Sequence, residues 1–334
     1  MSASDLPPPL AEEKPPGRSK KKRRANGNAA LPLSEYARNI MRIHFDSLLQ
    51  HEAGTRLGED IEELHDMRVA TRRLRAIFEV FDPAFRLRDI RPLLRDLRTA
   101  RRALGPVRDL DVFIDNARHY EAESGQNLQL LVDIWEHDRQ SARQQMLAYL
   151  DSPDFTAFKT DFDDFLNTPG QGARRFNPRT PYPQLTWQVA PLLIYQRYVD
   201  VLACENLIPE ASPDQLHDLR IRFKKLRYAI EFLRDVLGKP AALLIEDLKI
   251  MQDHLGNLND AHLSCDLLTA LLARLESESQ SLPIGVRPDL GGIISYLASL
   301  HARRRELAET FPAAWAHFTR PEFRRNLALA LSEL

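Results

Sequence analysis

The sequence predicts an all-α protein made of two four-helix bundles related by a pseudo-twofold axis. Leu occurs 51 times and Val only 10 times in 334 residues, a ratio that favours helix over strand. We find no stretch with the period-2 alternation of a half-buried strand. A block of the first half recurs in the second half, and such an internal duplication predicts two copies of one helical unit.

Residues 1–30 form the first segment, which we predict to be a disordered basic arm. It combines five prolines with the basic residues Arg18, Lys20, Lys21, Lys22, Arg23 and Arg24, and it has no apolar core. The arm is compatible with weak nucleic-acid binding, and it is equally compatible with a solvated tail without a partner. We place the folded domain at residues 31–334, with a first helical repeat at 31–166, a Pro- and Gly-rich linker at 167–183 and a second repeat at 184–334.

Each repeat is expected to hold about four long helices. Periodic apolar residues predict helices over Ser34–Gln50 and Leu128–Leu150 in the first repeat, and over Leu185–Glu205 and Ile293–Ala308 in the second. Gly and Pro residues are predicted to separate the elements. These breaks are Gly54, Pro83, Gly105 and Gly125 in the first repeat, and Gly238, Gly256 and Pro283 in the second.

The duplicated block is the most informative feature of the sequence. His65–Glu79 aligns without a gap on His217–Glu231, 152 residues later. About forty residues further on, Leu-Gly-Pro-Val-Arg-Asp at 104–109 corresponds to Leu-Gly-Asn-Leu-Asn-Asp at 255–260. We interpret both Leu-Gly pairs as turns, each fixed by the Asp that follows through capping or through pairing with a basic residue.

The duplicated block presents one cationic face when it is placed on a helix at 100° per residue. The apolar residues fall on the opposite side, so the helix is amphipathic. The basic stripe holds His65, Arg68, Arg72 and Arg75 in the first copy, with Arg73 at its edge, and His217, Arg220, Lys224 and Arg227 in the second copy, with Lys225 at its edge.

A second basic stripe precedes the first Leu-Gly pair. Helical spacing relates Arg91, Arg95, Arg98 and Arg102, with Arg101 beside them. In the second repeat only Lys249 is a basic residue at a corresponding position. Arg108 follows the first Leu-Gly pair, where the second copy has Asn259. We therefore expect the first repeat to contribute more to anion binding.

Charged helix faces are often merely solvated, so the stripes have a second interpretation without a ligand. The net charge of the chain is −1, yet residues 64–110 hold twelve Arg and six acidic residues. Like charges at i and i+4 destabilise a helix, and both copies keep this arrangement. That repetition favours an anion-binding surface, and the scattered histidines predict no metal site.

The rest of the composition favours a cytoplasmic protein. Cys204 and Cys265 form no metal-spaced or disulfide-like pair, no apolar run is long enough to span a membrane, and residues 1–30 lack the apolar core of a signal peptide. The oligomeric state is not predictable from these features.

The two blocks, HDMRVATRRLRAIFEVF with LGPVRDLD and HDLRIRFKKLRYAIEFL with LGNLND, resemble the CHAD domain, the conserved histidine α-helical domain. The resemblance covers nearly everything after the arm. It implies two four-helix bundles around a basic central surface, binding of inorganic polyphosphate and recruitment to polyphosphate granules in bacteria. It points to the basic and histidine residues of both duplicated blocks, and the chain leaves no room for the triphosphate-processing domain that accompanies many members.

We therefore expect a non-catalytic polyphosphate-binding module without a cofactor. One alternative is a nucleic-acid-binding protein that uses the same surface, although Trp135, Trp187 and Trp315 do not interleave with the Arg residues as in single-strand binders. The other is a phosphohydrolase, or a phosphotransferase with His65 or His217 as the acceptor. The sequence shows no acidic metal cluster or nucleophile–base pair for such an enzyme.

Overall fold

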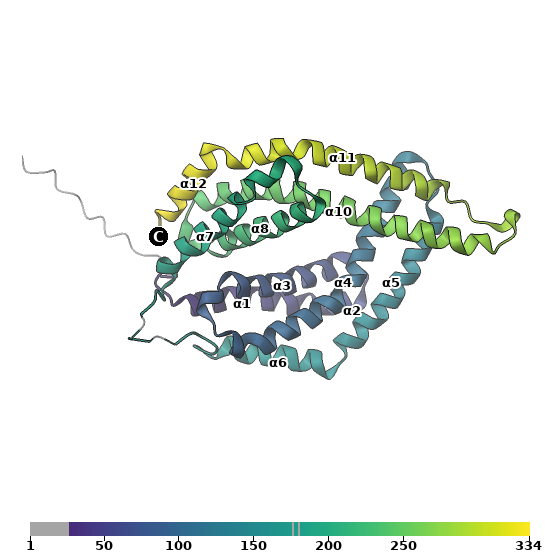
Figure 1. The fold of residues 1–334 in the computed structure, drawn as a ribbon. Helices are drawn as coiled ribbons and strands as arrows, with labels where there is room; N and C mark the ends of the chain where they lie inside the picture. The colour runs from purple at the N-terminus through teal and green to yellow at the C-terminus, as the bar shows by residue number, and fades with distance from the viewer. Residues whose placement is uncertain (1–26, 176, 180) are drawn as a thin grey trace, which may run out of the picture.

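The structure, a computed structural model, describes residues 27–175, 177–179 and 181–334. The all-helical prediction is confirmed, since this part of the chain holds no β-strand and only two isolated β-bridges (Figure 1). In the first half the α-helices are α1 (Leu33–Gln50), α2 (Glu52–Leu57), α3 (Ile61–Val80), α4 (Leu87–Ser124), α5 (Gln129–Leu150) and α6 (Pro153–Asn167). In the second half they are α7 (Thr186–Leu202), α8 (Pro213–Phe232), α9 (Arg234–Leu237), α10 (Pro240–Gln280), α11 (Gly291–Thr319) and α12 (Pro321–Leu331).

The first half packs around an aromatic core. Helix α6 begins at Pro153 after the N-cap Ser152, and it buries Phe residues at i, i+3, i+7 and i+10 from Phe155. Phe162 is fully buried and stacks on Phe45 of α1 with ring centroids 5.0 Å apart. Phe78 of α3 contacts Phe162 as well, at 6.3 Å. This packing turns the apolar side of α3 inward and leaves its basic side outside the core.

The second half has an aromatic core of its own. Phe318 of α11 lies 4.8 Å from Phe223 of α8 and 4.7 Å from Phe323 of α12, measured between ring centroids. Helix α8 begins with a capping box, in which Ser212 and Gln215 each accept the other's backbone N–H. In each half the helix that carries the duplicated block, α3 or α8, is followed by a long helix, α4 or α10, and we call α3 and α8 the motif helices. The structural duplication and the pseudo-twofold axis stay predictions.

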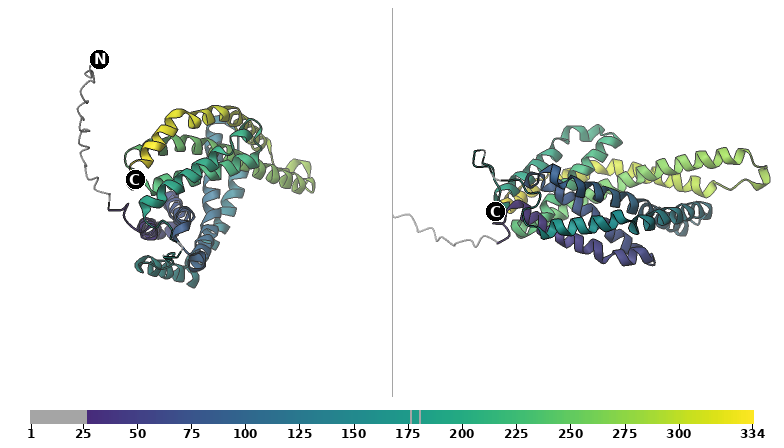
Figure 2. Two further views of the ribbon diagram at one scale, coloured as in Figure 1. Left: turned by 60° about the vertical axis from the view of Figure 1, so that its left-hand side comes forward. Right: turned by 90° about the horizontal axis from the view of Figure 1, so that it is seen from below.

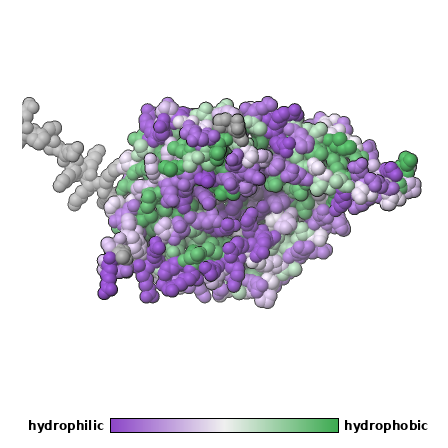
Figure 3. All heavy atoms as spheres, viewed as in Figure 1, coloured by the Kyte–Doolittle hydropathy of each residue, from purple (hydrophilic) through white to green (hydrophobic). Residues whose placement is uncertain are grey.

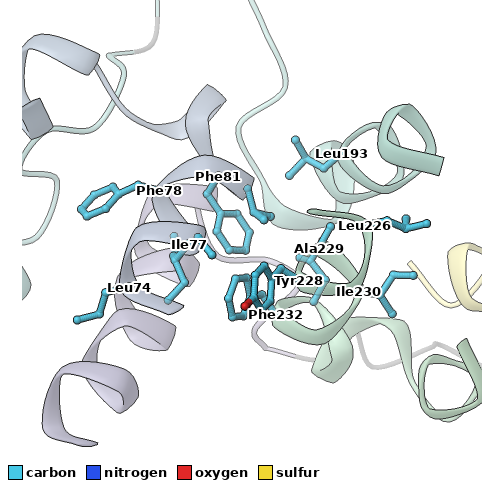
Figure 4. Packing of buried hydrophobic residues seen from close by; sticks show 14 of the residues in the cluster. Leu74, Ile77, Phe78, Phe81, Leu193, Leu226, Tyr228, Ala229, Ile230 and Phe232 are labelled. Carbon is cyan, nitrogen blue, oxygen red and sulfur yellow. The ribbon is translucent and has the colours of Figure 1, made fainter. Parts of the chain in front are cut away.

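The two halves meet at the C-terminal ends of α3 and α8. Phe81 and Phe232 lie 6.4 Å apart, and Figure 4 shows Ile77, Phe81, Tyr228 and Phe232 pointing toward one another between the two helices. Tyr36 of α1 donates a hydrogen bond of 2.8 Å to the carbonyl of Phe232. The two motif helices are therefore joined at one end by apolar contacts, and their N-terminal turns lie farther along.

A second apolar cluster joins the halves at the other end. There the end of α4 and the start of α5 pack against α10 and α11, with Tyr120 and Tyr296 at 4.8 Å. A Cβ atom on Gly292 would lie 2.0 Å from the carbonyl oxygen of Asn127, so this close approach requires glycine. Beyond the cluster, α10 and α11 project as a hairpin (Figure 2).

Three details of the sequence-based prediction need correction. Gly105 and Gly256 make no turns, because α4 and α10 run through them without a break. A glycine in a helix costs only about 1 kcal/mol, which buried neighbours such as Leu104 and Leu255 offset. Residues 1–26 of the predicted arm lie outside the described residues. Residues 27–30, which we also assigned to the arm, are ordered, because Ala29 is buried and its carbonyl accepts a hydrogen bond from the N–H of Trp187.

The predicted break at Gly54 is also wrong, because Gly54 lies within the short helix α2, but the other predicted helices and breaks agree better with the structure. Helix α5 matches the expected range to one residue, while α11 extends eleven residues beyond the expected end at Ala308. Pro83 lies in the short 3₁₀ segment between α3 and α4, and Gly125 caps the end of α4 in the left-handed region.

Candidate functional site

The basic residues of the duplicated block lie on α3 and α8, on the sides that face away from the two aromatic cores. Met67, Leu74 and Ile77 of α3 are completely buried, as are Phe223 and Leu226 of α8. The helical period then places the cations on the opposite side, as predicted. Hydrophilic side chains form a band across the middle of the molecule in Figure 3, between the two halves.

Cations from the two halves approach each other between α3 and α8. Arg73 of α3 lies 3.8 Å from the carboxylate of Glu231 of α8, measured from Nη2 to Oε2. Burial, together with the positive charges of Arg220 and of Arg72 from the other half, lowers the pKa of Lys224 to about 8. Arg72 and Lys224 are therefore close enough to repel each other across the junction.

Several motif cations are held in place by carboxylates. Arg68 donates to the carbonyl of Gly105 at 3.2 Å and to Asp109 at 2.7 Å, so Asp109 pairs with a basic residue. In the second half Arg220 lies 3.9 Å from Asp260. The remaining short pairs are Arg75–Glu79 at 3.0 Å, Arg227–Glu231 at 2.7 Å and Arg108–Glu62 at 3.3 Å.

Eight other basic residues in or beside the predicted stripes have no carboxylate within 4.0 Å in the described part of the chain. They are Arg72, Lys224, Lys225, Arg91, Arg98, Arg101, Arg102 and Lys249. An unpaired guanidinium keeps all of its donors available for an anionic ligand. These residues are thus the ones best able to contact a polyanion directly.

The contacts of Arg68 show which side of α4 faces α3. Relative to Gly105, residue 98 lies at about 20° and residue 101 at about 40° on the other side, so Arg98 and Arg101 continue the face that Arg68 contacts. Lys249 has the corresponding position on α10, which carries Asp260 opposite Arg220. The sequence places Arg101 only beside the predicted stripe. On α4 it lies on the same side as Gly105 and Asp109, which Arg68 contacts, and this helical spacing assigns it to the site.

We call these side chains together the central basic surface. It comprises Arg68, Arg72, Arg73, Arg75, Arg98, Arg101, Arg220, Lys224, Lys225, Arg227 and Lys249.

The remaining predicted residues lie at its margins or apart from it. Arg95 pairs with its neighbour Asp96 at 2.9 Å, and Asp154 and Asp161 of α6 lie near it, so it faces α6. Arg102 lies on the margin at about 60° from Gly105, and Arg91 lies about 21 Å farther along α4. Gln252 and Asp253 of α10 stand where α4 has Arg101 and Arg102, so the first half contributes more positive charge.

The two histidines lie near the N-terminal turns of α3 and α8. Burial, followed by the charge of Arg108, lowers the pKa of His65, which is therefore neutral at pH 7. Nδ1 of His217 lies 2.7 Å from Oδ1 of Asn259. Neither arrangement places a histidine in a metal site, and the described residues include no group of three His, Cys, Asp or Glu side chains that could hold a metal ion.

The sequence pattern of the CHAD domain matches residues 39–269. The chain belongs to the CHAD domain family. The crystal structure of the CHAD domain from the plant Ricinus communis is similar, with a TM-score of 0.61 and 21% identity over 90% of this chain and 93% of that chain. PptA from Streptomyces chartreusis is similar with a TM-score of 0.60 and 15% identity over 86% of this chain and 100% of that chain. These two likenesses establish a shared fold for this CHAD protein.

No curated protein matches the sequence. Among the described residues of this CHAD protein, no helix is both long enough and apolar enough to cross a membrane.

Proposed function

We propose that this protein binds inorganic polyphosphate on the central basic surface. The observation that carries the proposal is the approach of Arg72 and Lys224 from opposite halves, each without a carboxylate within 4.0 Å among the described residues. Like charges held together in this way favour a ligand that neutralises both. Family membership supports the same ligand, since the CHAD domain is known for polyphosphate binding.

The chemistry of the surface suits a linear phosphate chain. Such a chain has about one negative charge per phosphate, and guanidinium groups bind phosphate oxygens through two parallel hydrogen bonds. Tyr228 and Phe232 stack on each other at 5.5 Å and are buried, so their rings are engaged within the protein core. This arrangement favours a ligand without bases over a nucleic acid, whose recognition uses stacking.

We further propose that binding occurs without chemical conversion and that it brings the protein to polyphosphate granules. The cations Arg68, Arg75 and Arg227 are fixed by neighbouring carboxylates, an arrangement that supports a static binding face. Phosphate release from polyphosphate, or a mass increase of one phosphoryl group on His65 or His217, would contradict the first statement. A fluorescent fusion that stays diffuse in bacterial cells with visible granules would contradict the second.

The decisive experiment is a titration with long-chain polyphosphate at 50 and 200 mM salt. We expect affinity to fall steeply with salt, because bound cations release condensed counterions. The variant Arg72→Ala, Lys224→Ala should reduce the slope of log affinity against log salt by about two, one for each lost contact. Circular dichroism should show that the variant remains folded.

The matched control is Arg274→Ala, which removes an exposed cation of α10 that lies in the projecting hairpin, 3.9 Å from Glu278. Its salt slope should equal that of the wild type. An unchanged affinity of the folded double variant would overturn the proposed site. Displacement of polyphosphate by RNA at equal phosphate concentration would instead favour the nucleic-acid alternative.

A further inference from the structure

A separate cavity of about 790 Å³ lies in the second half, between the first turn of α8 and the facing sides of α10 and α11. Both α8 and α11 pack on α10, which forms the floor between them. The cavity is lined from α10 by Leu255, Leu258 and His262, and from α11 by His301 and Arg304. Its volume is that of a small-molecule site.

One part of the cavity is apolar. Leu216 of α8 and Leu255 and Leu258 of α10 line it, and Leu263 remains 49% exposed at the same place. An exposed leucine beside two buried ones extends an apolar wall that the protein itself leaves uncovered. A ligand with an apolar body would remove this surface from water.

The other part of the cavity is cationic. Arg304 and Arg305 of α11 line it, and neither has a carboxylate within 4.0 Å among the described residues. The one carboxylate in the lining, Asp214, belongs to α8. The Nη1 atom of Arg304 lies 3.5 Å from Nδ1 of His262, whose Nε2 atom lies 3.6 Å from Asp266.

The first half shows what the site of Arg304 lacks. Residue 111 of α4 corresponds to residue 262 of α10, because each follows the aligned Asp109 or Asp260 by two positions. In the first half this residue is the buried Asp111, and Arg139 of α5 donates a hydrogen bond to it. In the second half His262 replaces the aspartate, so Arg304 has an imidazole where Arg139 has a carboxylate.

We propose that this cavity binds an amphipathic anion, with an apolar body against the leucines and a carboxylate or phosphate group at Arg304. The anionic group would take the place at Arg304 that the Asp111 carboxylate has at Arg139. A charge-assisted pair in a partly enclosed site is stronger than an exposed one, so the anion adds affinity to the apolar contact. The lining includes the predicted binding residue His217 but no member of the central basic surface, and the proposal does not depend on polyphosphate binding.

The test uses two dyes that share an apolar body and differ in charge. Anilinonaphthalene-8-sulfonate has a sulfonate group, and N-phenyl-1-naphthylamine lacks it; both fluoresce when they leave water. We expect the sulfonate dye to bind the full-length protein at one saturable site, at least tenfold more tightly than the neutral dye. Equal dissociation constants, or no saturable binding, would overturn the proposal.

Two variants locate the dye. Arg304→Gln should weaken binding of the sulfonate dye at least fivefold and leave the neutral dye unaffected. His262→Asp should act in the same way, because it supplies Arg304 with an internal carboxylate. The control Arg303→Gln removes the neighbouring cation that pairs with Glu306 at 2.7 Å and should change neither dissociation constant. If Arg304→Gln binds both dyes as the wild type does, the proposal is wrong. A second control is Arg72→Ala, which should bind both dyes as the wild type does, because the dyes do not use the central basic surface.

Displacement then distinguishes the head groups. Decanoate and decyl phosphate have the same apolar chain with a carboxylate or a phosphate, and decanol is the neutral control. Displacement by either anion at concentrations where decanol has no effect supports the proposal and names the head group. Displacement by neither anion, or equally by decanol, would overturn it.

Discussion

The lowered pKa of Lys224 predicts that polyphosphate binding weakens above pH 8. Burial and the charges of Arg220 and Arg72 bring this pKa to about 8 in the free protein. A bound polyanion favours the charged amine, so binding raises the pKa and takes up a proton at higher pH. The contribution of Lys224 is therefore fully present below pH 8 and is lost as the pH rises.

The magnitude follows from the protonated fraction. With a pKa of about 8, roughly one molecule in ten has a charged Lys224 at pH 9, so affinity should fall about tenfold between pH 7 and pH 9. Partial exposure of the side chain makes this an upper value. The matched variant is Lys224→Arg, which keeps the positive charge across this range because arginine does not deprotonate in proteins.

Fluorescence anisotropy with end-labelled polyphosphate at constant ionic strength measures the effect. The wild type should lose affinity above pH 8, while Lys224→Arg should bind almost equally at pH 7 and pH 9. Internal phosphates of the chain stay ionised throughout, so the ligand does not contribute to the difference. Parallel pH profiles for the two proteins would refute the assignment of the proton to Lys224.

Three further predictions concern stability. Phe162→Ala should lower the free energy of unfolding in urea by about 3–5 kcal/mol, because the ring is fully buried among Phe45, Phe78 and Phe158. Burial and the charge of Arg73 lower the pKa of His44 to about 4, so stability should decline as the pH falls from about 6.5 to 4, and His44→Gln should flatten this decline in thermal unfolding. Gly292→Ala should cost about 1–3 kcal/mol by urea unfolding, since its methyl group would collide with the carbonyl of Asn127.

Each of these predictions has a control of the same chemistry. Leu192→Ala truncates a side chain that is 65% exposed, His119→Gln replaces an exposed histidine, and Gly285→Ala adds a methyl group that meets no atom within 4 Å. The three controls should leave stability and its pH dependence nearly unchanged. A control that matches its partner variant in effect would contradict the corresponding explanation.

The fold was predictable from the sequence where local pattern decides it. The apolar period of α3 and α5 gives their positions, and Pro83 and Gly125 end helices as their chemistry suggests. The predicted turns at Gly105 and Gly256 were wrong because tertiary burial outweighs a local penalty. Even Pro106, which costs about 3 kcal/mol inside a helix, lies within α4, beside the buried Leu104 and Val107.

The candidate site was predictable as a set of cations on helix faces, and its assembly was not. That Arg72 lies near Lys224 depends on how the C-terminal ends of α3 and α8 pack, which no local pattern encodes. Arg95 and Arg98 both fit the helical spacing of the predicted stripe, yet Arg95 faces the acidic residues of α6. The cavity at Arg304 forms where α8, α10 and α11 meet. In the sequence, only the replacement of Asp111 by His262 at the corresponding position indicates this site.

The two apolar contacts between the halves have a mechanical consequence. Repulsion between facing cations pushes α3 and α8 apart, while the Phe81–Phe232 contact at one end and the Tyr120–Tyr296 cluster at the other oppose that force. The distance between the cationic faces of α3 and α8 is thus set before any anion binds. A polyphosphate chain that binds there, as proposed, would meet charges that are already positioned, so little ordering entropy would be lost on association.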